Sequence, residues 1–234
     1  MTKLGIIGAM QVEVETLVDS LTHKAAHRKA GRTYYTGKLG GLEVVVVQCG
    51  VGKVNAAMCA QILCVCYGVS HIVNTGVAGA LSMELDIGDL VVSTDAMYHD
   101  FTCAVLGYQE GQVPGMDVLA YPADENLIAA AVKAAETVNP GHTKTGRIAS
   151  GDQFVCENSQ KEKIIAVTGG ACTEMEGAAI AHTAYRNGVP FVIMRAISDK
   201  ADNSAEMEFP VFEAIAAQRC AQVVRTLAKQ LKEN

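Results

Sequence analysis

The sequence predicts an α/β fold, a three-layer α/β/α sandwich with a mixed central sheet. Short apolar runs typical of strands alternate with segments of helical periodicity along the whole chain. Hydrophobic residues make up 50% of the 234 residues and charged residues 19%, which excludes a disordered chain and supplies a large core. No repeat, low-complexity tract or linker divides the sequence. We therefore expect a single domain over residues 1–234.

The first segments predict a strand, a helix and a hairpin. Leu4–Ala9 is a short apolar run of strand length. Apolar residues then recur at helical spacing through about His23. Two apolar runs, Tyr34–Leu39 and Leu42–Gln48, are separated by a glycine pair and predict two hairpin strands.

The middle of the chain predicts a helix, two strands and a long loop. Lys53–Tyr67 is apolar nearly all round, which predicts a buried helix, and Gly68 ends it. Strands are expected at His71–Thr75 and Asp89–Thr94. Residues 97–122 are richer in Gly, Pro, Tyr and Gln, which is typical of a long functional loop.

The last third continues the alternation of helices and strands. Asp124 is the expected N-cap of a helix that runs to Thr137. The further strands are expected at Arg147–Ser150, Ala171–Glu174 and Phe191–Ile197, and the further helices at Gly177–Asn187 and from about Val211 to Leu231. Ligands of such sheets bind beyond the carboxyl ends of the strands, so the residues that follow each strand are the candidate site.

Charge and hydropathy exclude several classes of partner. The formal charge of −6 argues against nucleic acid and against an anionic membrane surface. The longest nearly apolar stretch, Ala56–Val69, is shorter than the ~20 residues that a membrane span needs. No signal peptide is recognisable, and the eight cysteines lack metal-ligand spacing and predict reduced, packed thiols. We expect a cytoplasmic protein with a small-molecule partner.

The glycine motifs do not match nucleotide-cofactor loops. Gly5-Ile-Ile-Gly8 lacks the third glycine of a dinucleotide fingerprint. In the motif that begins Gly50-Val-Gly52, Asn55 occupies the position of that third glycine. Gly52-Lys53 lacks the flanking residues of a phosphate-binding P-loop. We therefore expect no NAD or ATP and no other cofactor.

Three strand ends each carry a carboxylate. Glu13 follows the first strand, Glu176 follows the segment that ends at Glu174, and Asp199 follows the last strand. Three acids suit cleavage of an N-glycosidic bond, in which a purine must be protonated, a ribosyl cation stabilised and a water deprotonated. Three acids at a sheet edge would suit Mg²⁺ equally well. The residue types alone do not distinguish N-glycosidic cleavage from Mg²⁺ binding.

Seven segments together carry a resemblance to a known family. They are Gly5-Ile-Ile-Gly-Ala-Met-Gln-Val-Glu13, Gly50-Val-Gly-Lys-Val54, Asn74-Thr-Gly-Val-Ala-Gly79, Tyr98-His-Asp100, Ser150-Gly-Asp-Gln-Phe154, Glu174-Met-Glu176 and Arg195-Ala-Ile-Ser-Asp199. The chain resembles the bacterial 5′-methylthioadenosine/S-adenosylhomocysteine nucleosidases of the nucleoside phosphorylase superfamily over nearly its whole length. The resemblance implies a nucleoside phosphorylase-like fold. It also implies hydrolysis of the two nucleosides, and of 5′-deoxyadenosine, in methionine salvage.

The resemblance also implies a role for each matching residue, without a metal. Asp199 would protonate adenine N7, Glu13 would deprotonate water, and Glu176 with Met175 would hold the ribose hydroxyls. The remaining residues that it implies line or organise the site: Phe154, Val155 and Gly79 at adenine, Arg195 beside the carboxylates, and Met10, Val51 and Phe209 around the 5′-alkylthio group.

The resemblance further implies a homodimer, because the neighbouring subunit completes the 5′ wall in this family. The corresponding segment here runs from Cys103 to Pro114 and includes Leu106 and Tyr108. Two departures from the family pattern concern substrate preference. Val77 stands where relatives often carry Ser, and Cys103 and Leu106 replace other apolar residues.

Three alternatives remain at this stage. A purine nucleoside phosphorylase of the same fold would need a cationic phosphate site, whereas Glu13 follows the first strand here. A futalosine or aminofutalosine hydrolase would keep the three acids and differ at the 5′ wall. A nucleoside-binding protein without catalysis could share the fold, since fold does not fix function.

Overall fold

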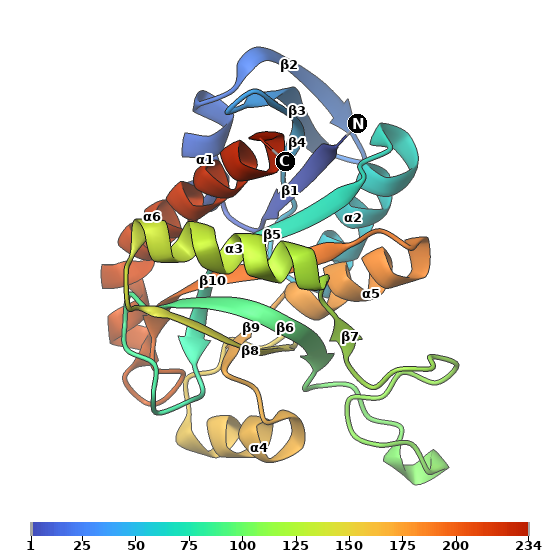
Figure 1. Ribbon diagram of the computed structural model, residues 1–234. Helices are drawn as coiled ribbons and strands as arrows, with labels where there is room; N and C mark the ends of the chain where they lie inside the picture. Colours follow the sequence, from blue (N-terminus) through green and yellow to red (C-terminus); the bar gives the residue numbers. More distant parts are fainter. Residues whose placement is uncertain (1, 234) are drawn as a thin grey trace.

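A computed structural model describes residues 2–233, and ten strands in it form one sheet (Figure 1). The strands are β1 (Lys3–Gly8), β2 (Thr22–Lys29), β3 (Arg32–Leu39), β4 (Leu42–Gln48), β5 (His71–Ala80), β6 (Leu90–Tyr98), β7 (Tyr121–Pro122), β8 (Thr143–Ser150), β9 (Cys172–Glu174) and β10 (Phe191–Asp199). Their order is β10-β6-β8-β9-β5-β1-β4-β3-β2, with β7 paired to β6.

The sheet is mixed, as the sequence predicts. β1 is parallel to β4 and β5, and β10 is parallel to β5. The β2–β3 and β3–β4 pairs are antiparallel, and so are β6–β10 and β5–β9. Because β10 pairs with β5 as well as with β6, five of the strands close into a ring. The carboxyl ends of β1, β5 and β10 therefore lie at one edge of the sheet.

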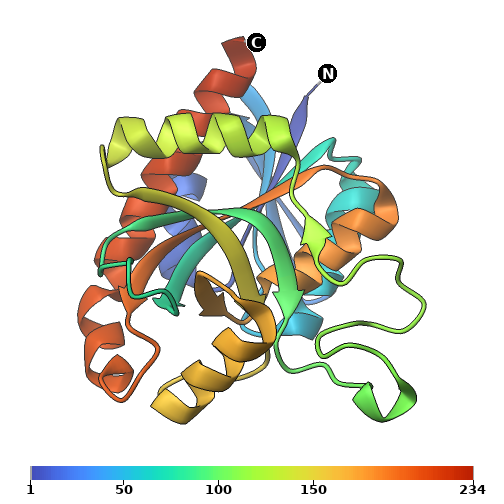
Figure 2. The ribbon, with the colours of Figure 1, turned by 60° about the horizontal axis from the view of Figure 1, so that its bottom comes forward.

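Helices cover both faces of the sheet and make three layers (Figures 1 and 2). The helices are α1 (Gln11–Asp19), α2 (Lys53–Tyr67), α3 (Glu125–Val138), α4 (Asn158–Thr168), α5 (Gly177–Asn187) and α6 (Ala205–Glu233), with a 3₁₀ turn at Ala104–Leu106. α1, α3 and α6 share one apolar core with the sheet, and α2 and α5 share a second. This arrangement confirms the predicted α/β/α fold class.

The first helix is shorter than the sequence predicts. It ends at Asp19 instead of about His23, with Ser20 as its C-cap and the Ser20 hydroxyl bonded to the Thr16 carbonyl. Thr22–Lys29 then forms β2, an edge strand whose residues are all exposed. This strand was not predicted, because a strand exposed on both faces has no apolar alternation.

Two other helices also differ from the prediction. Lys53–Tyr67 has the predicted bounds but is not buried all round, because Val54, Met58 and Val65 are exposed. α6 begins at Ala205, before Pro210, instead of at about Val211. The Ser204 carbonyl accepts the first bonds of that helix, from the N–H groups of residues 207 and 208.

The predicted helix caps and thiols are largely confirmed. Asp124 accepts a bond from Leu127 N at 2.9 Å and caps α3. All eight cysteines are free, but Cys66 is exposed on α2 and does not fill the core as expected. Among residues 2–233, no helix combines the length and the apolar character that crossing a membrane requires.

Candidate active site

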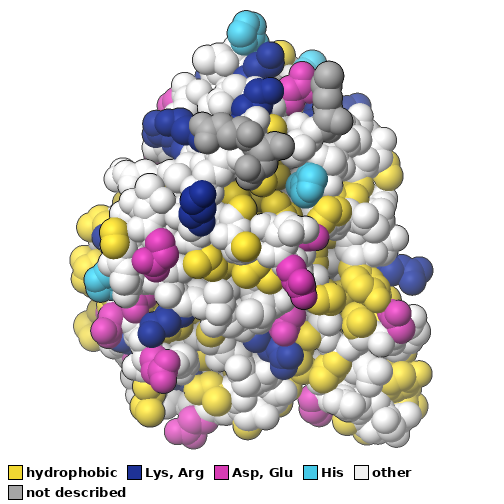
Figure 3. Space-filling model, in the orientation of Figure 1, with side chains coloured by type: hydrophobic (Ala, Val, Ile, Leu, Met, Phe, Trp, Pro, Cys, Tyr) yellow, Lys and Arg dark blue, Asp and Glu magenta, His cyan; other side chains and the backbone are white. Residues whose placement is uncertain are grey.

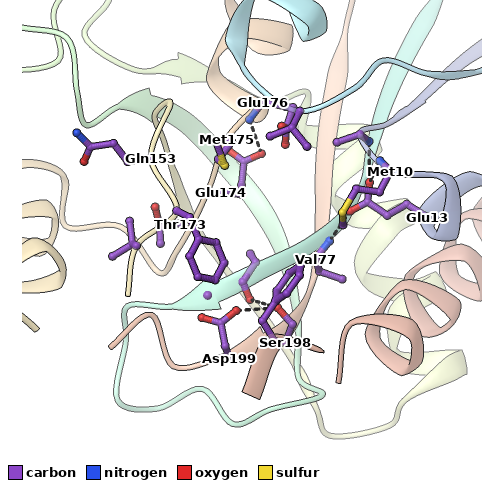
Figure 4. A pocket seen from close by; sticks show the side chains of 17 residues that line it. Met10, Glu13, Val77, Gln153, Thr173, Glu174, Met175, Glu176, Ser198 and Asp199 are labelled. Atoms are coloured by element: carbon purple, nitrogen blue, oxygen red, sulfur yellow. Dashed lines mark hydrogen bonds between the residues drawn. The ribbon is translucent and has the colours of Figure 1, made fainter. Parts of the chain in front are cut away.

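A cavity of about 410 Å³ opens at the carboxyl edge of the sheet (Figure 4). It brings together most of the site residues that the sequence predicts, namely Met10, Glu13, Val51, Val77, Gly79, Phe154, Val155, Met175, Glu176, Asp199 and Phe209. Its other lining residues are Ala9, Ala78, Gln153, Thr173, Glu174 and Ser198. The walls come from the carboxyl ends of β5, β9 and β10, from the segments that follow β1, β4, β8 and β9, and from α6.

Glu13 is held in the first turn of α1 by three backbone donors. Its Oε2 accepts bonds from Ala9 N at 2.6 Å and Met10 N at 2.9 Å, and its Oε1 accepts one from Val77 N at 3.1 Å. Burial raises the pKa of Glu13, while the Arg195 guanidinium and these three N–H groups oppose that rise. The carboxylate is thus both desolvated and fixed in orientation.

Glycine at position 76 makes room for this arrangement. A Cβ on Gly76 would overlap Glu13 Oε1 and lie 2.5 Å from Arg195 Nη1. Any larger residue would therefore push apart the carboxylate and the guanidinium behind it.

Glu176 is placed by the N-terminus of α2. Its Oε1 accepts a bond from Gly52 N at 2.8 Å, where the positive end of the helix dipole favours an anion. Burial raises the pKa of Glu176, and the neighbouring Glu174 carboxylate raises it further. Glu176 lies 3.9 Å from Arg195 Nη2, the distance of a weak ion pair.

Glu174 and Arg195 form the support behind the pocket. Glu174 accepts bonds from Arg195, the Ser150 hydroxyl and Gly177 N, and Arg195 also donates to Asn74 Oδ1 at 2.6 Å. Arg195 is predicted from the sequence as a site residue, but it is only 1% exposed and does not line the cavity. It acts on the site through the carboxylates that it contacts.

Asp199 ends β10 on the opposite wall from Glu176 (Figure 4). Its Oδ1 accepts a bond from Ala201 N and its Oδ2 one from the Ser198 hydroxyl, both at 2.8 Å. Burial raises the pKa of Asp199, and the charges of Glu208 and Asp202 raise it further. The bonds from Ala201 N and the Ser198 hydroxyl oppose this rise.

Gly79 is a site residue because of the space that it leaves. A Cβ at this position would lie 2.7 Å from Asp199 Oδ1 and 2.8 Å from the Ala201 Cβ. Gly79 in β5 pairs with Asp199 in the adjacent strand β10, just past a register shift in β10. The two residues therefore lie side by side.

Aromatic and apolar side chains form the mouth of the cavity. The rings of Phe154 and Phe209 meet edge to face, with centroids 5.5 Å apart. Val51 and Phe154 remain 48% and 45% exposed, whereas Val155 is buried. Flat aromatic faces at an apolar mouth suit a planar base and an uncharged tail.

Four predicted site residues lie away from this cavity. Cys103, Leu106, Tyr108 and Pro114 belong to the segment between β6 and β7, which projects from the body of the molecule (Figure 2). From the sequence they are predicted to complete the pocket of a partner subunit, not that of their own chain.

Several lining residues were not singled out from the sequence. Ser198 precedes Asp199 and donates to it, and adjacency to the acid was the available signal. Gln153 lies in the motif Ser150–Phe154, in which only Phe154 was predicted to be a site residue. Thr173 and Ala78 occupy strand positions that no pattern distinguishes from ordinary core. Among residues 2–233, no group of three or more His, Cys, Asp or Glu side chains is arranged to hold a metal ion.

Comparisons with known proteins find relatives over nearly the whole chain. A family model described as the phosphorylase superfamily matches residues 3–229. A 5′-methylthioadenosine/S-adenosylhomocysteine nucleosidase of Staphylococcus aureus is 42% identical over 231 residues, which are 97% of this chain and 100% of that protein.

Two solved structures share the fold. The nucleosidase of Colwellia psychrerythraea in complex with adenine has a TM-score of 0.94 and 38% identity, covering 98% of this chain and 96% of its own. Futalosine hydrolase of Helicobacter pylori has a TM-score of 0.92 and 30% identity, covering 98% of both chains. Because the family model and these relatives extend over nearly the full length, the chain belongs to the phosphorylase superfamily and, within it, to the 5′-methylthioadenosine/S-adenosylhomocysteine nucleosidase family.

Proposed function

We propose that this chain hydrolyses the N-glycosidic bond of 5′-methylthioadenosine and S-adenosylhomocysteine, releasing adenine and a 5-thioribose product. One observation carries the proposal. The carboxyl groups of Glu13, Glu176 and Asp199 come from separate strand ends and line a single cavity. The names of the relatives, which are 38–42% identical over nearly the whole chain, support the same reaction.

The neighbours of the two outer carboxyl groups support their division into acid and base. Asp199 has anionic neighbours and burial to hold a proton, which suits an acid directed at a purine nitrogen. Glu13 has three N–H donors and Arg195 nearby, which favour the ionised form that a base requires. In this mechanism Asp199 gives its proton to adenine N7 as the glycosidic bond breaks, and Glu13 takes a proton from the attacking water.

Glu176 suits the ribose between these two groups. An anion fixed by Gly52 N can accept hydrogen bonds from ribose hydroxyls and stabilise a ribosyl cation. Phe154 would stack on adenine, with the Val155 backbone at its edge, and Met10, Val51 and Phe209 would contact the 5′ substituent. Val77 places an apolar side chain, not a hydroxyl, beside Glu13.

The cavity favours water over phosphate as the nucleophile. Among its described lining residues none is Lys, Arg or His, and Arg195 is engaged by Glu174 and Asn74 behind the wall. A phosphate ion would meet Glu13 without a compensating cation, and a like-charge pair at ~4 Å costs about 4 kcal/mol at an effective dielectric of ~20. Phosphorolysis is therefore the less favourable alternative.

We further propose that the chain acts as a cytoplasmic homodimer of single-domain subunits. Support for the dimer comes from Val54, Met58 and Val65, which are exposed at spacings that place them on one face of α2. Val105 and Leu106 on the projecting loop are 97% and 72% exposed. Exposed large apolar side chains gathered on one helix face are typical of a protein–protein interface.

Adenine release from candidate nucleosides tests the proposed reaction. The substrates are methylthioadenosine, S-adenosylhomocysteine, 5′-deoxyadenosine and aminofutalosine, each with and without phosphate and with and without a chelator. We expect phosphate-independent and chelator-resistant release, fastest from the two thio-nucleosides. Faster release from aminofutalosine would favour the alternative of an aminofutalosine hydrolase.

Other outcomes would replace the proposal. Strict dependence on phosphate would make the chain a phosphorylase, and loss of activity with chelator would require a metal. Binding of nucleosides without turnover would make it a nucleoside-binding protein.

A further inference from the structure

Lys53 lies beside the cavity and joins three segments that the sequence separates widely. Its Nζ is 2.5 Å from Asp100 Oδ2, at the end of β6, and 3.6 Å from Asp152 Oδ2, in the loop after β8. Its backbone N–H donates to Asp152 Oδ1 at 2.8 Å, and Asp152 N donates to Asp100 Oδ2 at 2.8 Å. The three residues therefore form a closed ring of contacts, which we term the Lys53 network.

The network shares the N-terminus of α2 with a site carboxylate. Gly52, the N-cap of α2, has no side chain to satisfy the first N–H groups of the helix. Carboxylates from two other loops do so instead, Glu176 at Gly52 N and Asp152 at Lys53 N. The N-terminus of α2 thus holds both Glu176 and the loop that carries Phe154.

The ion pair at the centre of this network is well shielded. The side chains of Lys53 and Asp100 are 22% and 15% exposed, and Lys53 Nζ also lies 5.5 Å from the centre of the Tyr98 ring. Burial opposes ionisation of Asp100, but the bonds from Lys53 and from Asp152 N still hold its pKa below the ordinary value. A partly buried, hydrogen-bonded charge pair fixes geometry more firmly than a surface pair does.

None of the three residues lines the cavity. Asp152 is nevertheless two residues from Phe154, and Lys53 is two residues from Val51, both of which line it. A shift of either backbone would therefore move a wall of the base and tail pocket, while Glu13 and Asp199 keep their own hydrogen bonds.

We propose that Lys53, Asp100 and Asp152 are positioning residues that hold the Phe154 loop against the start of α2 and so set the affinity of the site for the purine. The proposal deepens the proposed function, since it assumes that the Phe154 loop receives adenine. The network adjusts binding more than the chemical step, because Asp199 and Glu13 are held by separate hydrogen bonds.

Substitution of Lys53 by Met tests the cation while keeping the apolar stem. For Lys53→Met we expect the Kd for adenine, measured by calorimetry, and the KM for methylthioadenosine to rise roughly tenfold, while kcat changes less than about threefold. The matched control is Lys24→Met, since Lys24 forms an exposed pair with Asp19 at 3.7 Å on the far β2 edge. It should leave both constants unchanged.

Asp152 offers a second test that does not depend on Lys53. Asp152→Asn retains an oxygen that can accept the bond from Lys53 N, whereas Asp152→Ala removes it. We expect the alanine variant to weaken adenine binding clearly more than the asparagine variant. Asp100→Asn should add little to Lys53→Met, because residues that act as a unit are not additive.

The readouts distinguish this proposal from the proposed function. If the wild-type chain binds adenine but releases none from any nucleoside, the proposed function fails and adenine affinity still tests the network. A fall of kcat with unchanged KM and adenine Kd in Lys53→Met would overturn the network's role. So would equal effects of Lys53→Met and Lys24→Met, or of the two Asp152 variants.

Discussion

Glu13 and Asp199 are both buried carboxyl groups, yet their neighbours differ in charge. Arg195 faces Glu13, whereas Glu208 and Asp202 face Asp199. Burial raises the pKa of both groups, and hydrogen bonds oppose that rise in both. The charged neighbours act in opposite directions, because Arg195 lowers the pKa of Glu13 whereas Glu208 and Asp202 raise that of Asp199. These charges favour a proton on Asp199 over one on Glu13.

Replacing either carboxyl group by its amide tests this division. We expect Asp199→Asn and Glu13→Gln each to lower kcat for adenine release by on the order of 10²–10⁴, the usual contribution of a general acid or base. The affinity for adenine should change little in Glu13→Gln. Glu15→Gln, on the exposed side of the same helix, is the matched control. Activity retained in either site variant would remove that residue from the mechanism.

The charge of Glu208 gives a prediction for pH dependence. Glu208 Oε2 accepts a bond from Lys200 N at 2.9 Å, and its charge adds to burial in raising the pKa of Asp199. Removing that charge in Glu208→Gln lowers the pKa, so Asp199 loses its proton at a lower pH. We expect the alkaline limb of the kcat/KM profile to move to lower pH. An unmoved limb, or an equal shift in exposed Glu84→Gln, would show that another group titrates.

At the scale of elements, the site depends on how closely two strands approach. β5 and β10 bring Gly79 opposite Asp199, and a methyl group at Gly79 would stand 2.7 Å from the carboxylate. The bond from Ala201 N to Asp199 would have to shift with it. The acid is therefore positioned by strand pairing as much as by its own hydrogen bonds.

Gly79→Ala should accordingly reduce activity and cost about 1–3 kcal/mol of unfolding free energy, as overpacking usually does. The loss should fall mainly on kcat, because Asp199 is the displaced group. Gly31→Ala is the control, since Gly31 has a φ of +76° but nothing within 4 Å of an added Cβ. It should lose stability through strain and keep its activity. Equal loss of activity in both variants would contradict the steric argument.

Elements with a clear apolar pattern could be predicted from the sequence, and others could not. The bounds of α2 and α5 match the prediction, because glycines end both helices in the left-handed conformation. β2 carries no apolar alternation, and α6 begins at Ala205, earlier than the predicted start at about Val211. Solvent exposure and tertiary contacts, not the local sequence pattern, determine the structure of these two segments.

The candidate site was predictable where motifs carry its residues. Glu13, Glu176 and Asp199 follow strands, and the sheet brings strand ends together. The contacts of Arg195 were harder to predict from the sequence, because its partners Asn74 and Glu174 lie 121 and 21 residues away. The contact between Lys53 and Asp152 was hidden for the same reason.

At the scale of the whole molecule, the chain combines an open pocket with an apolar surface. Val51 and Phe154 at the mouth are about half exposed. Apolar side chains also gather next to β7 and over the projecting loop (Figure 3). Val105 and Leu106 on that loop are largely exposed, and the loop does not reach its own chain's pocket. A second copy of the chain that packs on α2 and receives the loop would bury this apolar surface and cover the open pocket.

Charged substitutions on α2 test the homodimer. Val54 and Met58, 71% and 47% exposed, are one helical turn apart, and neither lies in the cavity wall. We expect Val54→Glu and Met58→Glu to move the protein toward monomer in analytical ultracentrifugation, because a buried, unpaired carboxylate is costly. Adenine release should then fall through a higher KM, since the 5′ wall supplied by the partner is lost. Met83→Glu, at a 97% exposed methionine between β5 and β6, should change neither property. A wild-type protein that sediments as a fully active monomer would show that one chain completes its own pocket.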